Sequence, residues 1–207
     1  MTDGDGNTAL AAAPRRASVS RRTRETDVRV EIRLDGRGEA DVHTGIGFYD
    51  HLLSSLGHHA LFDLMVRAEG DLQVDEHHTV EDVALALGSA LGEALGDRSG
   101  IRRFGDASVP MDESLATAAV DVGGRPYAVV DLPFKGDRVG ALPLDLVQHA
   151  MESLARTAGV TVHLSGAGRN DHHLAEAAFK ALGRAFGEAT EPHPRRTGVA
   201  STKGALG

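Results

Sequence analysis

Residues 86–94 read ALGSALGEA and residues 181–189 read ALGRAFGEA, so the chain contains one nonapeptide pattern twice. Nine residues before each copy stands a pair of histidines, followed three positions later by a glutamate. These clusters are His77, His78 and Glu81 in the first half of the chain and His172, His173 and Glu176 in the second. A separation of 95 positions superimposes clusters and nonapeptides together, which indicates an internal duplication.

The length of 207 residues fits one globular domain or two small ones. From the duplication we expect two half-domains with a shared core, at about residues 19–98 and 99–207. A disordered tail over residues 1–18, rich in small and polar residues, is expected to precede them. The apolar fraction is 41%, with six Phe, two Tyr and no Trp, so Ala, Leu and Val must fill most of the core.

The pattern of apolar residues predicts the elements of the first half. Apolar and polar residues alternate over residues 27–34, which is typical of a half-buried strand, and a turn at 35–38 leads into a second strand. A short helix at 48–56 and a strand at 61–68 follow. An apolar stripe from Val80 to Leu95 predicts an amphipathic helix, so the order is ββαβα.

The second half repeats this order after a linker over residues 96–110. Its predicted elements are strands at 115–122 and 127–132 paired around a turn at 123–126, a helix at 144–155, a strand at 160–164 and a helix at 172–189. Two ββαβα halves predict an α+β fold in which two mixed sheets are layered with helices.

Composition and charge exclude several classes of protein. Without Cys, the chain has no disulfide, thiolate metal ligand or cysteine nucleophile. No apolar run approaches the roughly 20 residues of a membrane helix, and the N-terminal residues lack the features of a secretory signal. The net charge of -8 argues against binding to nucleic acid or anionic membranes. We therefore expect a soluble, cytoplasmic protein.

The duplicated clusters have the residue types and the spacing of metal ligands. On a helix, residues four apart share a face, whereas neighbours point about 100° apart. His77 can therefore act together with Glu81 while His78 points elsewhere, and the second cluster repeats this geometry. His51 and His149, each on the short helix of its half, extend the set to six His and two Glu. Such a set suits Mn, Fe, Co, Ni or Zn.

A single cluster of this kind is more often a helix cap or a surface feature than a metal site. Its recurrence in register, with an upstream His in each half, favours metal binding.

Positively charged residues supply candidate anion ligands, with the hydroxyls of Ser201 and Thr202 beside one of them. These residues are Arg103, Arg125, Lys180 and Lys203.

Several ordered motifs resemble the imidazoleglycerol-phosphate dehydratase family, from about residue 21 to residue 206. The longest are RETDVRVEIRLDGRG (24–38), FYDHLLSSLGHHALFDL (48–64), HHTVEDVALALG (77–88) and HHLAEAAFKA (172–181). Shorter ones are GIRRFGDA (100–107), MDE (111–113), GRPY (124–127) and STKGAL (201–206). The resemblance implies a dehydratase domain over residues 19–207 that converts imidazole glycerol phosphate to imidazole acetol phosphate and water in histidine biosynthesis.

The resemblance also assigns residues. It implies two Mn²⁺ ions per active site, bound by His51, His77, His78, Glu81, His149, His172, His173 and Glu176, the same eight as the spacing suggests. It implies catalytic roles for Glu25, His51, His77, Glu81, His172 and Glu176. Substrate contacts are implied for Glu25, His51, His59, His77, Glu81, Arg103, Arg125, His172, Lys180, Ser201, Thr202 and Lys203. It further implies a homo-24-mer with active sites between protomers.

The substrate chemistry suggests why two ions are needed. The proton to be removed lies on a carbon with no adjacent carbonyl, so we expect a metal-bound imidazolate that expels a hydroxyl to give a diazafulvene-like intermediate. Glu25 is the candidate acid/base.

Two other readings remain open. A dinuclear metallohydrolase normally uses bridging carboxylates, and two Glu against six His supply few. A non-enzymatic metal-binding shell leaves the scattered Arg and Lys unexplained. An RNA-binding module does not fit the acidic net charge.

Overall fold

The computed structural model describes residues 14–206, and the elements of its two halves follow the same order. The first half contains β1 (Arg16–Arg22), β2 (Thr26–Arg33), β3 (Ala40–His43), α1 (Gly47–Ala60), β4 (Asp63–Gly70) and α2 (His77–Leu95). The second contains β5 (Phe104–Met111), β6 (Ser114–Asp121), β7 (Tyr127–Asp131), α3 (Asp145–Ala158), β10 (Thr161–Ala167) and α4 (Asp171–Thr190). A small hairpin, β8 (Arg138–Val139) and β9 (Leu142–Pro143), precedes α3.

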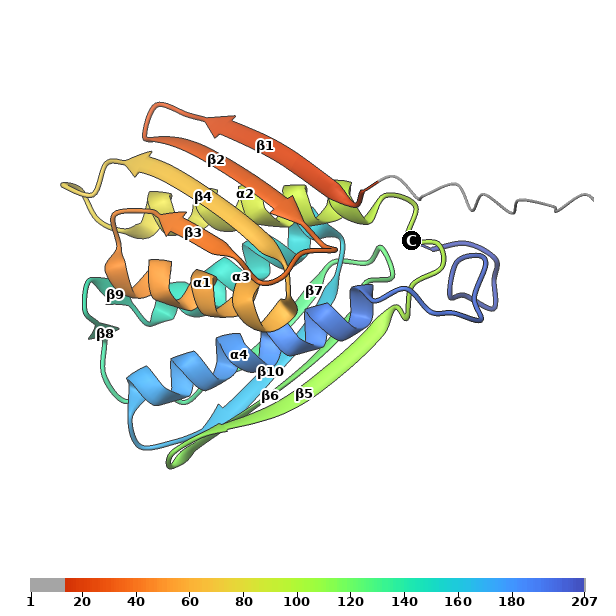
Figure 1. The fold of residues 1–207 in the computed structure, drawn as a ribbon. Helices are drawn as coiled ribbons and strands as arrows, with labels where there is room; N and C mark the ends of the chain where they lie inside the picture. Colours follow the sequence, from red (N-terminus) through yellow and green to blue (C-terminus); the bar gives the residue numbers. More distant parts are fainter. Residues whose placement is uncertain (1–13, 207) are drawn as a thin grey trace, which may run out of the picture.

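The two four-stranded sheets have equivalent strand orders, β1-β2-β4-β3 and β5-β6-β10-β7. In each sheet the last pair is parallel, β3 with β4 and β7 with β10, and the other pairs are antiparallel. All four helices lie between the sheets (Figure 1). The predicted α+β class, with two mixed sheets layered with helices, is confirmed.

Besides the small β8–β9 hairpin, each half has one strand more in its four-stranded sheet than predicted. β1 begins at Arg16, so the predicted tail wrongly included residues 16–18, while residues 1–13 lie outside the described part of the chain. β5 lies in the stretch predicted to be a linker, residues 96–110. Both are edge strands: β1 carries mostly polar side chains, whereas β5 is interrupted by Gly105 and Pro110. Their alternation is therefore weak.

The missing strands also made the predicted hairpins wrong. β2 pairs with the preceding β1 and with β4, not with the strand that follows it. In the same way β6 pairs with β5 and β10, and β7 joins the sheet beside β10. The turn at residues 123–126 therefore connects two strands that are not neighbours. A sequence pattern finds strands, but their pairing depends on which neighbours are present.

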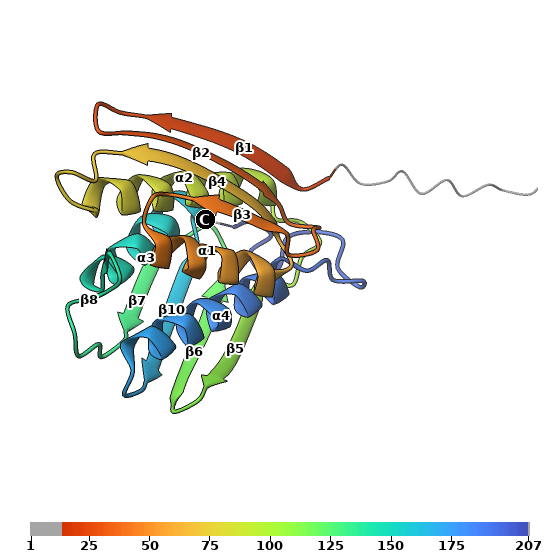
Figure 2. The same ribbon diagram turned by 60° about the vertical axis from the view of Figure 1, so that its left-hand side comes forward.

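The helices pack against the sheet of their own half and against one helix of the other half. α1 and α2 cover the first sheet, whereas α3 and α4 cover the second. Between the sheets, α1 packs on α4 and α2 packs on α3, as the turned view makes clear (Figure 2). The side chains of all four helices contribute to one continuous apolar core.

Glycines of the repeated nonapeptide lie at these helix crossings. A Cβ atom at Gly183 of α4 would come within 2.5 Å of the carbonyl oxygen of Leu56 in α1. A Cβ atom at Gly88 of α2 would come within 2.4 Å of the carbonyl oxygen of Leu154 in α3. Real Cβ atoms do not approach an oxygen so closely, so only glycine permits this helix spacing. The nonapeptide is therefore repeated because the same helix crossing occurs twice.

Substitution of either glycine by alanine should destabilise the protein. Although alanine favours the helix intrinsically, Gly183→Ala or Gly88→Ala must push two backbones apart, at a net cost of about 1–3 kcal/mol. Thermal unfolding of the metal-free protein at fixed concentration should then show a midpoint several degrees lower. Gly47→Ala, where a Cβ atom meets nothing within 4 Å, is the matched control and should not lower the midpoint. Equal midpoints for all three variants would contradict this account.

Candidate metal centre

Six of the eight predicted ligands form two separate groups. His51, His172 and Glu176 make the first group, and His77, Glu81 and His149 make the second. Within each group, one possible ligand atom of every residue lies within 4.8 Å of the others. Each group combines the first turns of one long helix with a histidine from the short helix of the other half. His51 thus lies beside the cluster of the second half, and His149 beside that of the first.

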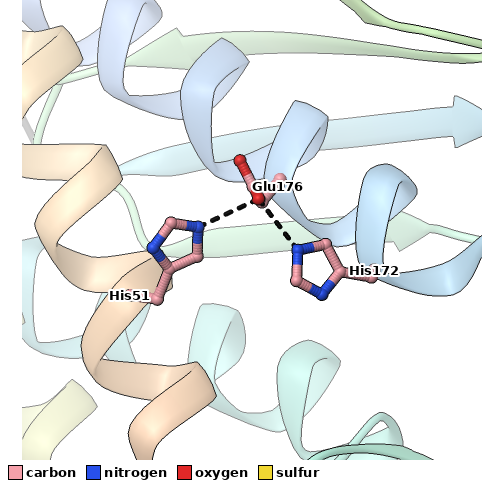
Figure 3. A group of neighbouring side chains, drawn as sticks. All are labelled: His51, His172 and Glu176. Carbon is pink, nitrogen blue, oxygen red and sulfur yellow. Dashed lines mark hydrogen bonds and ion pairs between the residues drawn. The ribbon is translucent and has the colours of Figure 1, made fainter.

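The first group is centred on a buried carboxylate. Nε2 of His51 and Nε2 of His172 both lie 2.9 Å from Oε1 of Glu176, so both rings point toward one oxygen (Figure 3). Nζ of Lys180 donates to the other oxygen at 2.6 Å. Burial alone would raise the pKa of Glu176, but hydrogen bonds from Lys180, His51 and His172 outweigh it and lower the pKa to about 2. The carboxyl of Glu176 is therefore ionised at neutral pH.

The second group has no fully buried member, and it leaves a nitrogen without a partner. Nε2 of His149 is buried and accepts or donates no hydrogen bond within residues 14–206. Its nearest charged neighbour is Oε1 of Glu81, at 3.5 Å, and its ring lies 4.8 Å from that of His77. Buried imidazole nitrogens normally have a partner. An imidazole nitrogen of this kind beside a second imidazole and a carboxylate fits a transition-metal ion.

Local hydrogen bonds fix where the ligand helices begin. The side chain of Asn170 accepts from the backbone N–H of His172 at 3.0 Å and so caps α4. The carboxylate of Asp75 accepts from the backbone N–H of His77 at 2.9 Å at the start of α2. Once the starts of α2 and α4 are fixed in this way, the four-residue spacing between His and Glu brings the two side chains to one face of each helix.

The other two predicted ligands, His78 and His173, lie outside the two groups. The ring of His78 is turned 85° from that of His77, and the ring of His173 is turned 83° from that of His172. Asp71 holds Nδ1 of His78 at 3.1 Å, and Glu113 holds Nδ1 of His173 at 2.9 Å. A carboxylate on one ring nitrogen is the usual way in which a metal-binding histidine is oriented.

These carboxylates also change the ionisation of the two rings. The hydrogen bond to Asp71 raises the pKa of His78, and the nearby carboxylate of Glu25 adds to that shift. The hydrogen bond to Glu113 raises the pKa of His173 in the same way. The pKa of Glu113 is lowered to about 2, chiefly by its hydrogen bond with His173.

The predicted anion ligands lie in two places. Arg103, Arg125, Ser201, Thr202 and Lys203 line one pocket of about 350 Å³. Arg103 is fixed there because its guanidinium donates to both carboxylate oxygens of Asp121, at 2.7 and 2.9 Å. Lys180 lies beside Glu176 instead, and His59 is near the end of α1. A larger pocket of about 700 Å³ on the first sheet contains none of the predicted site residues.

The anion pocket is far from the first group within one chain. The backbone N–H of Arg103 donates to the carbonyl of Ala189, near the end of α4, whereas His172 stands at the start of that helix. With a rise of about 1.5 Å per residue, the two ends are roughly 25 Å apart. Figure 1 agrees with this arrangement, since the helices begin at one end of the molecule and the C-terminal segment lies at the other.

Comparisons with known proteins all lead to one family. A family model described as imidazoleglycerol-phosphate dehydratase matches residues 44–186. A protein of that name from Symbiobacterium thermophilum is 53% identical over 207 residues and is covered completely, as is this chain. Another from Methanosarcina mazei is 54% identical over 190 residues, which are 92% of this chain and 98% of the relative.

Solved structures agree. A crystal structure of IGPD from Pyrococcus furiosus, in complex with (S)-C348, is 37% identical with a TM-score of 0.78, over 91% of this chain and 100% of that one. The imidazoleglycerol-phosphate dehydratase of Staphylococcus aureus is 31% identical with a TM-score of 0.78, over 86% and 99%. None of the helices within residues 14–206 is both long and apolar enough to cross a bilayer.

The assignment of ligands to two groups across the halves predicts which substitutions affect the same ion. His51→Ala and His172→Ala should each weaken the binding of the same ion, so the double variant should lose no more metal than either single variant. His51→Ala combined with His77→Ala should lose both ions, because these ligands belong to different groups. Metal content by mass spectrometry after dialysis distinguishes the two results.

His43→Ala is the control for the loss of a histidine, since His43 is exposed on β3 and belongs to neither group. Its metal content should equal that of the unmodified protein. Greater loss from the His51 and His172 pair than from the His51 and His77 pair would contradict the assignment.

Proposed function

The chain belongs to the imidazoleglycerol-phosphate dehydratase family, with its dehydratase role in histidine biosynthesis, and we propose that the two His/Glu groups are where it performs this reaction. The reaction converts imidazole glycerol phosphate to imidazole acetol phosphate and water. As an enzyme of amino-acid biosynthesis, it would act in the cytoplasm.

The observation that carries the proposal is the pair of equivalent His/Glu groups, one of which contains a buried imidazole nitrogen without a partner. We propose that these groups, with His78 and His173, hold two Mn²⁺ ions per active site. When bound, the ions would supply the positive charge that stabilises the substrate ring as an imidazolate. A hydrolase with bridging carboxylates is less well supported, because the two groups share no carboxylate within residues 14–206.

The proposed reaction removes a hydroxyl from the carbon attached to the ring and a proton from the next carbon. The imidazolate would expel the hydroxyl, which would take a proton from Glu25 and leave as water, giving a diazafulvene-like intermediate. Loss of the proton from the neighbouring carbon then gives an enol, which tautomerises to the ketone. We propose Glu25 as the acid/base, since its carboxylate is exposed and close to His78.

The pocket lined by Arg103, Arg125, Ser201, Thr202 and Lys203 would bind the phosphate of the substrate. Guanidinium, ammonium and hydroxyl groups are typical phosphate ligands. Lys180 and His59 would contact the substrate near Glu176, whose carboxylate forms an ion pair with Lys180. The remaining proposed substrate contacts are the metal-binding residues His51, His77, Glu81 and His172.

One protomer cannot supply all of these contacts. The phosphate pocket and the first group are roughly 25 Å apart along α4, which is longer than the substrate. We therefore propose that the active site lies between protomers, with the phosphate pocket of one facing the ions of another. This arrangement fits the homo-24-mer that the resemblance implies, in which His78 and His173 would complete the ion sites.

Activity and metal content test the central proposal. The purified protein should dehydrate imidazole glycerol phosphate when Mn²⁺ is present and stop after chelation, with recovery when Mn²⁺ is restored. Glu25→Gln should lower kcat by about 10²- to 10⁴-fold while metal content stays unchanged. Full turnover by the metal-free protein, or by Glu25→Gln, would contradict the corresponding part of the proposal.

A shared site predicts complementation between inactive subunits. Arg103→Ala should lose phosphate binding and His172→Ala should lose metal, so each variant alone should be inactive. Co-expression should restore activity, because some sites then combine an intact phosphate pocket with an intact metal group from different subunits. The double variant Arg103→Ala/His172→Ala, expressed alone so that every subunit carries both substitutions, is the control and should stay inactive. Absence of any recovery would mean that both sets act within one subunit.

A further inference from the structure

The turn that carries Glu25 is organised by its neighbouring threonines. It connects β1 to β2, and the backbone N–H of Thr23 donates to the carbonyl of Thr26 at 2.9 Å. The hydroxyl oxygen of Thr23 accepts from the backbone N–H groups of Glu25 and Thr26, at 3.1 and 3.0 Å. The backbone of Glu25 is therefore held in one conformation while its side chain extends into solvent.

A buried carboxylate attaches this turn to α2. Asp82, which is 5% exposed, accepts from the hydroxyl of Thr26 at 2.5 Å and from Nε of Arg21 at 2.7 Å. The hydroxyl of Thr23 donates to the same carboxylate at 3.4 Å. All three donors come from the turn or from the strand ends that flank it, Arg21 in β1 and Thr26 in β2. Burial of a carboxylate costs free energy because the charge loses its hydration, so it is stable only where its hydrogen-bond partners are held firmly.

Asp82 directly follows Glu81, a member of the second metal group. Neighbouring residues on a helix point about 100° apart, so one turn of α2 presents Glu81 to the metal group and Asp82 to the Glu25 turn. The distance from the acid/base candidate to the metal group is thus set through two adjacent side chains on a rigid element.

The equivalent turn in the second half of the chain lacks this attachment, and its glutamate has a different environment. Glu113 precedes β6 as Glu25 precedes β2, and Ala177 stands 95 positions after Asp82. The Glu113 carboxylate is fully engaged, with His173 at 2.9 Å and the backbone N–H groups of Arg169 and Asn170. In the first half Asp71 holds the equivalent His78, and the Glu25 carboxylate makes no hydrogen bond or ion pair within residues 14–206.

We propose that Asp82 is a positioning residue for the reaction: it fixes the turn that carries Glu25 at a set place relative to the metal group. The inference rests on the acid/base role proposed for Glu25. Asp82 touches neither metal nor substrate, so its removal should change the rate of the chemical step and not the affinity for either.

Two substitutions remove the attachment in different ways. Asp82→Asn keeps the shape of the side chain but removes its charge, and Thr26→Val removes the donating hydroxyl while keeping the volume. Each should lower kcat by about 10- to 100-fold, with KM nearly unchanged and full metal content by mass spectrometry. Thr26→Ser, which keeps the hydroxyl, should retain most of the activity. If Asp82→Asn fails to fold, the Thr26 pair still gives the answer.

A double-mutant cycle separates positioning from a general effect on the structure. In the Glu25→Gln background, Asp82→Asn or Thr26→Val should cause no further loss of kcat, because the group that it positions is already gone. An additional loss of the same size, normal kcat in Thr26→Val, or a parallel loss of metal would overturn the proposal for Asp82 and leave the proposed function intact. Full activity of Glu25→Gln alone would instead overturn the acid/base role and the positioning role together.

Discussion

The contact between backbones at the two helix crossings is the constraint on which the rest of the molecule depends. Gly183 lies against the carbonyl of Leu56, and Gly88 lies against the carbonyl of Leu154, at distances that no other residue allows. The crossings fix the separation of α1 from α4 and of α3 from α2. Because His51 stands five residues before Leu56, and His149 five residues before Leu154, the same crossings bring both histidines to the long helices of the opposite halves.

As a result, neither half of the duplicated chain contains a complete metal group. Each group joins ligands from both halves, so an ion bound at either group would bridge them and stabilise their docking. The duplication also leaves room for difference. Glu113 is hydrogen-bonded to His173. The equivalent His78 is hydrogen-bonded to Asp71 instead, so the carboxylate of Glu25 stays exposed to solvent. A symmetric scaffold thereby carries an asymmetric set of acidic side chains.

Sequence patterns predicted the helices well and the sheets less well. The apolar stripe of α2 and the His-Glu spacing are local properties of a helix, so they could be read directly from the residues. β1 and β5 could not, since the polar side chains of β1 resemble a tail, and Gly105 and Pro110 in β5 resemble a linker. Without these two strands, β2 and β6 were paired with the wrong neighbours. The attachment of the Glu25 turn to Asp82 gave no local signal either, because its members are about 60 positions apart.

The sequence by itself determined the internal repeat, the eight candidate ligands and the face that each His and Glu pair shares, because helical periodicity depends only on residues a few positions apart. The family followed from ordered motifs along the chain. Only the tertiary structure decided that His51 lies with Glu176 and His149 with Glu81, and that the pocket proposed for the phosphate lies at the far end of α4. Those relations depend on how helices and sheets from different halves pack, and packing is a property of the whole core.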